Sequence, residues 1–218
     1  MIEEGDRIAV GVSGGKDSLT LLMALRQIQN FLPRKFHLEA VTLTMGIGEF
    51  DLTPVRELCS RIGVNYTIEE TVIGKIIFEA REEKNPCSLC ANLRRGALHN
   101  VAKELGCNKV ALAHHRDDVV ETVLLSMFYE GRYHTFSPVT YLERKDLYLI
   151  RPLVYTEEKL VKEFIKLNSV ATVPSPCYIN GKTKRQYIKE LLTDMHKKNR
   201  DIKNNIFGAL RRSGIDGW

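Results

Sequence analysis

Segments typical of buried β-strands alternate with segments of helical period through the first 153 residues of this 218-residue chain. Strands are expected at residues 7–12, 36–43, 64–68, 109–113 and 147–153, and a helix is expected after the first, second and fourth of them. Parallel strands need crossover connections of this length, and such crossovers are almost always right-handed. We therefore predict an α/β fold, a parallel five-stranded sheet with helices on both faces.

The composition fits a soluble globular chain, with 44% hydrophobic and 27% charged residues. No apolar run approaches the roughly 20 residues that a membrane helix needs. The acidic N-terminus also lacks the basic start of a secretory signal. We expect a cytoplasmic protein that does not enter a membrane.

A glycine-rich turn follows the first strand, where open α/β sheets bind their ligands. Backbone amides at Gly14 and Gly15 can close on a phosphate, Ser13 and Ser18 add hydroxyl donors, Lys16 adds a positive charge, and Asp17 is a candidate Mg²⁺ ligand. The turn is not a Walker A loop, because three residues separate Gly11 from Gly15 and an aspartate follows the lysine. Its glycines also do not match the dinucleotide-binding spacing.

Three acids follow the fourth strand, at the start of the next expected helix. Asp117, Asp118 and Glu121 fall near one helical face. Clustered carboxylates repel one another unless a cation or substrate offsets their charge. Either Asp117 or Asp118 is a candidate for binding Mg²⁺ or accepting a proton.

The five cysteines are an odd number, and thiols in a cytosolic protein stay reduced. Cys87 and Cys90 lie at the start of a helix, and Cys177 lies in a proline-rich loop. Their spacing fits a zinc site with a fourth ligand from Cys107 or a histidine, an iron–sulfur cluster with three protein ligands, or a redox pair of Cys87 and Cys90. Cys59 and Cys107 are expected to be small buried residues.

Positive charge is concentrated near the C-terminus. Residues 182–212 hold ten Lys or Arg and three acids, a net charge of +7 in a chain whose total is +5. Such segregation favours a polyanion partner, and the alternative is a solvated helical face. The candidate RNA-binding residues are Lys182, Lys184, Arg185, Lys197, Lys198 and Arg200.

These motifs resemble those of a known family. Residues 13–18 are similar to the PP-loop of the ATP pyrophosphatases, which cleave ATP between its α and β phosphates. Residues 114–122 resemble the His-x-x-Asp-Asp-x-x-Glu-Thr signature of PP-loop enzymes that modify tRNA. The cysteine pair leading into residues 93–96, the later Cys177 and residues 181–186 resemble the tRNA 2-thiocytidine synthetase group.

The resemblance implies a set of sites. ATP and Mg²⁺ would bind at Ser13 to Ser18, with adenine near Thr44, Met45 and His114. The implied catalytic residues are Lys16, Asp17, Asp117 and Asp118, and the implied ligands of a 4Fe-4S cluster are Cys87, Cys90 and Cys177. The PP-loop domain would span residues 1–172, with a cysteine insertion near 85–96, and the basic helical segment residues 173–218.

The resemblance also implies a reaction. The enzyme would adenylate the C2 oxygen of an anticodon-loop cytidine, at position 32, and replace it with sulfur delivered through the cluster, giving 2-thiocytidine, AMP and pyrophosphate. Its partners would be tRNA, a sulfur donor (a cysteine desulfurase or free sulfide) and a second copy in a homodimer. The alternatives are a PP-loop tRNA-modifying enzyme that forms 2-thiouridine or delivers nitrogen, and a non-catalytic zinc- or nucleotide-dependent RNA-binding module.

Overall fold

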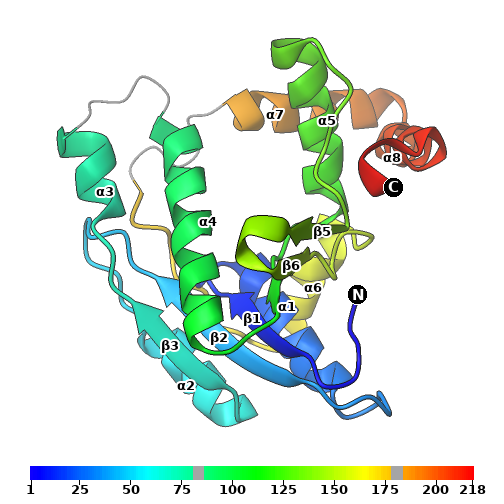
Figure 1. Ribbon diagram of the computed structural model, residues 1–218. Coiled ribbons are helices and arrows are strands. Elements are labelled where there is room, and N and C mark those ends of the chain that lie inside the picture. The colour runs from blue at the N-terminus through cyan, green and yellow to red at the C-terminus, as the bar shows by residue number, and fades with distance from the viewer. Residues whose placement is uncertain (81–85, 178–183) are drawn as a thin grey trace.

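A six-stranded, mostly parallel sheet forms the centre of the protein in the computed structural model, which describes residues 1–80, 86–177 and 184–218 (Figure 1). The strand order is β3-β2-β1-β4-β6-β5. In chain order the strands are β1 (Arg7–Gly11), β2 (His37–Leu43), β3 (Asn65–Glu69), β4 (Lys109–Ala111), β5 (Val139–Leu142) and β6 (Leu147–Ile150).

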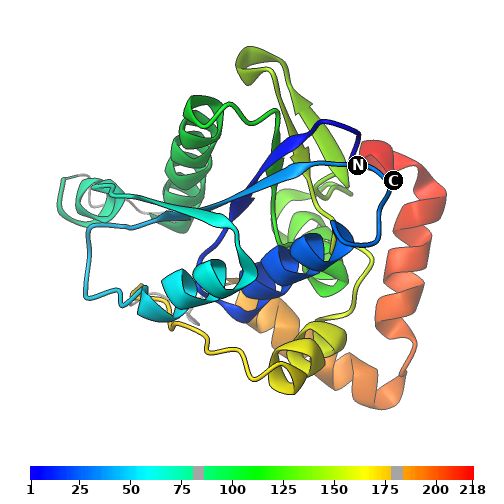
Figure 2. The same cartoon turned by 90° about the horizontal axis from the view of Figure 1, so that it is seen from below.

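Helices cover both faces of this sheet, as predicted. Alternate residues of β1 point to opposite faces, so Ile8 and Val10 join one hydrophobic cluster and Ala9 joins another. The first cluster includes side chains of α1 (Lys16–Ile28), α2 (Thr53–Ile62) and α6 (Glu158–Leu167), and α1 and α2 lie across the sheet in Figure 2. The second cluster is closed by α4 (Pro86–Glu104). The short α3 (Ile73–Lys75) and the π-turn Ile76–Ala80 precede α4.

The sheet differs from the prediction by one strand. β5 pairs antiparallel with β6 through the single 3₁₀ turn Glu143–Lys145, so the sheet has six strands rather than five. β5 is an edge strand, and 47% of Tyr141 is exposed. Because neither face of β5 is fully buried, its sequence carries no apolar run that would have predicted it.

The basic C-terminal segment is helical, as predicted, and packs against α5 (Arg116–Glu130). It forms α7 (Lys184–Lys198) and α8 (Ile202–Ser213), followed by the 3₁₀ turn Ile215–Gly217. Ile188, Leu192 and Leu210 share one buried cluster with Val120 and Val123 of α5. The segment after residue 172 therefore shares a hydrophobic core with the rest of the fold. Within the described residues, no helix has the length and apolar character to span a membrane.

Candidate active site

A cavity of about 560 Å³ opens where β1, β2, β4 and β6 end, and residues of both α4 and α5 contribute to its lining. The predicted position of the site, beyond the carboxyl ends of the strands, agrees with this cavity. The lining residues are Gly11, Val12, Ser13, Asp17, Ser18, Val41, Leu43, Ala91, Arg94, Arg95, Leu98, Leu112, Ala113, His114, Asp118, Phe136 and Arg151.

The glycine-rich turn is held by its own hydroxyl groups. The Ser13 N–H donates to Ser18 Oγ at 3.1 Å, and that hydroxyl donates to the Gly15 carbonyl at 2.9 Å. Gly14 has a φ of +78°, and the Val173 N–H donates to its carbonyl at 2.9 Å. A Cβ on Gly14 would lie 2.8 Å from the Val173 Cβ. The turn thus needs glycine at position 14 for both its backbone conformation and its contact with residue 173.

Lys16 begins α1 and lies between two carboxylates. Its Nζ is 2.7 Å from Asp17 Oδ1 and 3.1 Å from Glu158 Oε1. Burial lowers the pKa of Lys16, but hydrogen bonds and charge from Asp17 and Glu158 outweigh it and raise the pKa above its ordinary value. Lys16 is therefore a fixed positive charge at the start of α1, beside Asp17, which lines the cavity.

The two adjacent aspartates of α5 have different partners. Asp118 lines the cavity, and its Oδ2 accepts from the His115 N–H at 2.9 Å while His115 Nδ1 accepts from the Asp118 N–H at 3.2 Å. Asp117 is absent from that lining and accepts instead from the Glu158 N–H at 2.8 Å and from Lys203 Nζ at 2.7 Å. The structure therefore brings Asp118 to the loop and gives Asp117 partners in α6 and α8.

His114 contributes a neutral imidazole to the cavity. Burial is the main cause that lowers its pKa to about 4, and the charge of Arg151 acts in the same direction. Its ring stacks on Phe136 with the centroids 4.6 Å apart. The buried Nδ1 has no hydrogen-bond partner among the described residues, so it is available to a ligand.

Thr44 and Met45, two of the predicted adenine contacts, are not among the residues that line the cavity, and their role stays a prediction. The Thr44 N–H donates to the Glu69 carbonyl at 2.9 Å, and the Thr44 carbonyl accepts from Thr71 Oγ1 at 2.6 Å. The Met45 carbonyl accepts from the Gly74 N–H at 2.8 Å. The Thr44 N–H, the Thr44 carbonyl and the Met45 carbonyl are therefore already hydrogen-bonded within the fold. Leu43, the last residue of β2, does line the cavity.

Of the three cysteines singled out by their spacing, Cys87 and Cys90 lie at the start of α4, and Cys177 lies near enough for its charge to act on Cys90. Burial is the main cause that raises the Cys90 pKa; the charges of Cys177 and Cys87 raise it further, and Arg94 lowers it. Ala91 and Arg94, one and four residues after Cys90 on α4, line the cavity, and none of the three cysteines is itself among the lining residues. Cys59 and Cys107 are buried in the two sheet clusters, and burial raises the pKa of each thiol to about 11.

Three free thiols from distant parts of the chain are the donor type that an iron–sulfur cluster takes. Within the described residues, no three His, Cys, Asp or Glu side chains are already arranged around a metal position. The chemistry of the donors fits a cluster, and the described side chains are not preassembled around one.

The predicted RNA-binding residues divide into paired and unpaired groups. Arg185 is 3.2 Å from Glu121 Oε2 and 3.6 Å from Asp118 Oδ1, and Lys184 lies over the Tyr129 ring at 4.4 Å. Lys197 pairs with Asp194 at 2.7 Å on the exposed surface. Lys198 and Arg200 are exposed and make no ion pair within the described residues. Lys182 lies outside the described residues.

Sequence reasoning gave no site role to several cavity residues. Arg94 and Arg95 come from α4, Phe136 precedes β5, and Arg151 directly follows β6. The position of Arg151 at the carboxyl end of a strand was a usable signal, because ligands bind at that edge. The ion pair between Glu158 and Lys16 could not be predicted from the sequence, because 142 residues separate the two in the chain.

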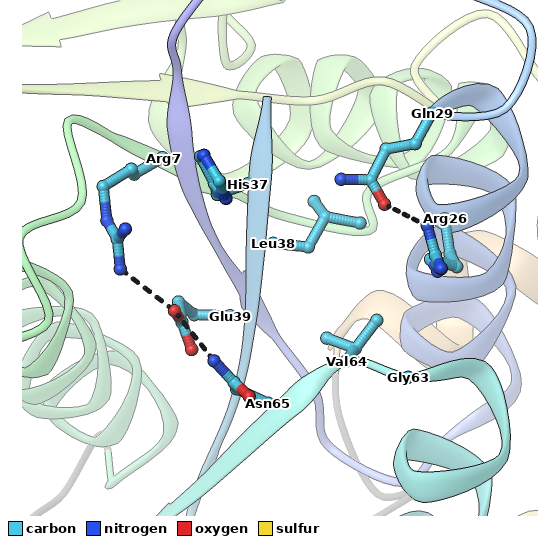
Figure 3. A pocket seen from close by; sticks show the side chains of 9 residues that line it. All are labelled: Arg7, Arg26, Gln29, His37, Leu38, Glu39, Gly63, Val64 and Asn65. Carbon is cyan, nitrogen blue, oxygen red and sulfur yellow. Dashed lines mark hydrogen bonds and ion pairs between the residues drawn. The ribbon is translucent and has the colours of Figure 1, made fainter. Parts of the chain in front are cut away.

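A second cavity, of about 260 Å³, lies at the amino ends of β1, β2 and β3, opposite the candidate active site (Figure 3). Its polar side chains bond to one another: Arg7 is 3.1 Å from Glu39, Asn65 donates to Glu39 at 3.4 Å, and Arg26 donates to Gln29 at 3.0 Å. The Arg7–Glu39–Asn65 contacts join the first parts of three strands, and the Arg26–Gln29 contact lies separately at the end of α1, so we assign both a structural role.

A family model described as a PP-loop domain matches residues 2–195. The chain belongs to the PP-loop family. Two curated relatives are tRNA-cytidine(32) 2-sulfurtransferases, from Geobacter metallireducens and Alcanivorax borkumensis, and each is 40% identical to this chain. The first match covers 96% of this chain and 83% of the relative, and the second covers 97% and 75%. The predicted resemblance is confirmed.

Solved structures agree on the fold. The U34-tRNA thiolase NcsA from Methanococcus maripaludis, solved with its 4Fe-4S cluster, matches with a TM-score of 0.79 and 24% identity over 96% of this chain and 72% of that one. The NH3-dependent NAD synthetase from Campylobacter jejuni matches with a TM-score of 0.51 and 18% identity over 97% of this chain and 84% of that one. Both comparisons confirm the predicted α/β class.

Proposed function

We propose that this protein is an ATP-dependent tRNA sulfurtransferase that converts an anticodon-loop cytidine, at position 32, to 2-thiocytidine. The observation that carries the proposal is one cavity lined by the PP-loop residues Ser13, Asp17 and Ser18 and by Ala91 and Arg94 of α4, the helix that carries Cys87 and Cys90. The relatives named tRNA-cytidine(32) 2-sulfurtransferase support the choice of base.

ATP binds with its phosphates on the loop and its adenine inside the cavity. The amides of Gly14 and Gly15 and the start of α1 suit the phosphates. Val41, Leu43 and Leu112 offer apolar surface to the adenine. Lys16 offsets charge that develops as the bond between the α and β phosphates breaks.

Mg²⁺ fits the carboxylates of Asp17 and Asp118, both of which line the cavity. Mg²⁺ is commonly held by one or two carboxylates together with substrate phosphates, so these two carboxylates and the phosphates of ATP would complete the site. The capping contacts with His115 fix the direction of the Asp118 carboxylate.

The reaction has two displacements. The C2 oxygen of the cytidine attacks the α-phosphate and pyrophosphate leaves, and a sulfur nucleophile then replaces the adenylated oxygen, releasing AMP. Cys87, Cys90 and Cys177 would hold a 4Fe-4S cluster, which supplies sulfur-binding chemistry when present. His114 remains neutral at physiological pH and offers Nδ1 as a hydrogen-bond acceptor or donor in the same space.

The partners follow from this chemistry. Lys198 and Arg200 contact phosphates of the tRNA, and a cysteine desulfurase or free sulfide provides the sulfur. The protein works where tRNA is present, in the cytoplasm, and a homodimer stays a prediction.

Product analysis tests this function directly. Purified protein, cytidine-containing tRNA, ATP and a sulfide source should yield AMP and pyrophosphate in a tRNA-dependent way. Lys16→Ala should fold normally and lose pyrophosphate release by about 10²-fold or more, because it removes a charge that acts on the transition state. Lys166→Ala, an exposed lysine of α6, is the matched control and should retain full activity. Formation of ADP and phosphate instead would exclude the proposed reaction.

A further inference from the structure

Three arginines contribute to the cavity lining, and the reaction as described gives them no role. Arg94 and Arg95 come from α4, and Arg151 follows β6. The hydroxyl groups of Ser13 and Ser18, next to the phosphate-binding glycines, line the same cavity from the loop and α1. The cavity therefore offers two separate sets of anion-binding groups.

These arginines lack carboxylate partners. Among the described residues, none of the three forms an ion pair. Arg95 bonds to the Ala91 carbonyl and to Asn92 on its own helix. Arg151 donates to the Ser137 carbonyl at 2.6 Å and to Thr140 Oγ1 at 3.3 Å. Neutral acceptors thus hold both guanidinium groups in place without offsetting their charge.

Arg151 is the more unusual of the two. Only 6% of it is exposed, its Nε has no partner among the described residues, and its guanidinium lies 4.9 Å from the centroid of the Phe136 ring. Burial, together with the charge of Arg95, lowers its pKa to about 10. A buried charge is costly unless it is paired, and a second positive charge nearby adds to that cost. An anion between Arg95 and Arg151 would remove both costs.

We propose that Arg95 and Arg151 bind a phosphodiester of the RNA chain next to the cytidine that is modified. Guanidinium groups match phosphate oxygens with two parallel hydrogen bonds. The phosphates of ATP already have the glycine loop and Lys16. Arg94, which precedes Arg95 on α4, lies beside Cys90. Arg95 and Arg151 therefore lie on the side of the cavity where the base must meet sulfur. A cytidine turned into the cavity brings its own flanking phosphates with it.

This inference rests on the proposed function, and a double-mutant cycle tests it. The ligands are anticodon stem-loop RNAs in which the linkage 5′ or 3′ of cytidine 32 is replaced by an uncharged methylphosphonate. With the wild-type protein, one of these replacements should weaken binding about tenfold, as expected for loss of a charge-assisted hydrogen bond. In Arg95→Gln and in Arg151→Gln the same replacement should change affinity less than twofold.

Two controls keep the result specific. Arg61→Gln, an exposed arginine on α2, should behave as the wild type. Affinity for a non-hydrolysable ATP analogue without RNA should stay within twofold in every variant. Arg95 is exposed, so Arg95→Gln still provides the test if loss of the Ser137 contact unfolds Arg151→Gln.

Failure of the inference differs from failure of the function. If wild-type protein thiolates the RNA but neither linkage couples to either arginine, the proposed phosphate site is wrong. Loss of affinity for the ATP analogue without coupling would assign the arginines to the nucleotide and would equally overturn the proposal. A wild-type protein that does not bind or thiolate the stem-loop would contradict the function itself.

Discussion

Asp117 and Asp118 are neighbours in the sequence and have different surroundings in the fold. Asp118 reaches the cavity, whereas Asp117 bonds to Lys203 and to the backbone of Glu158. Sequence reasoning predicted that acids at this position serve the site, but it did not decide between them. That choice depends on partners 41 and 86 residues further along the chain.

The different surroundings predict different effects of Asp117→Asn and Asp118→Asn. Burial raises the Asp117 pKa, but hydrogen bonds from Glu158 and Lys203 outweigh it, and the pKa lies below its ordinary 3.8. The charged form therefore stabilises the fold above pH 3.8, and this contribution is lost as the pH falls through the lowered pKa. Asp117→Asn should lower the unfolding free energy at pH 7 by about 1–2 kcal/mol and weaken its fall in acid.

Urea denaturation from pH 2.5 to 7 measures this difference. Asp118→Asn should keep most of the stability, because asparagine can still accept from the His115 N–H, yet it should lose tRNA-dependent pyrophosphate release. Full activity in Asp118→Asn together with an inactive but stable Asp117→Asn would reverse the assignment.

Gly14 is the second residue whose identity the structure explains. Gly14→Ala places a side chain at φ +78° and against Val173, which should cost roughly 1–3 kcal/mol and weaken ATP binding. Gly96→Ala is the matched control, because Gly96 lies within α4, has no positive φ, and its new Cβ would meet nothing within 4 Å. Urea denaturation and titration with an ATP analogue compare the two. Wild-type ATP affinity in Gly14→Ala would contradict the assigned loop.

At the scale of elements, the repeated strand-and-helix pattern predicted nearly all of the sheet. The edge strand β5 was not expected, and two inner strands are shorter than predicted: β4 ends at Ala111 rather than at residue 113, and β6 ends at Ile150 rather than at residue 153. The adenine contacts expected at Thr44 and Met45 stay a prediction. Which backbone groups of a turn stay free depends on later segments, here Thr71 and Gly74.

The charge of α7 also has more than one use. The sequence predicted a surface for a polyanion, but Arg185 and Lys189 pair with Glu121 and Glu158 inside the fold. Net charge alone does not distinguish a cation that faces solvent from one that neutralises a distant acid. Lys198 and Arg200 are exposed and make no ion pair with any described residue, so they are better candidates for RNA contacts than the paired cations.

Neutralising these two residues tests the surface. Lys198→Gln combined with Arg200→Gln should reduce the log–log salt slope of tRNA binding by about two, one for each cation lost from a phosphate contact. Binding of the ATP analogue and thermal stability should not change. Lys166→Gln serves as control. An unchanged salt slope in the double variant would show that Lys198 and Arg200 are solvated and do not contact tRNA phosphates.

At the scale of the whole molecule, the fold joins parts of the chain that are far apart. Val173, four residues before Cys177, donates its N–H to the Gly14 carbonyl, so the segment that leads to the third cysteine packs against the phosphate-binding turn. The spacing of Cys87 and Cys90 was visible in the sequence, but spacing left zinc, cluster and redox roles open. The fold adds that α4, which carries Cys87 and Cys90, also lines the cavity through Ala91 and Arg94.

The most direct test of the central claim is nucleoside mass spectrometry of tRNA from a strain that lacks this protein. If this protein thiolates cytidine, we expect 2-thiocytidine to disappear from the tRNA. The wild-type gene or Cys107→Ala should restore it, and Cys177→Ala should not. Retention of 2-thiocytidine in the deletion strain, in the absence of a second such enzyme, or its full restoration by Cys177→Ala would contradict the account.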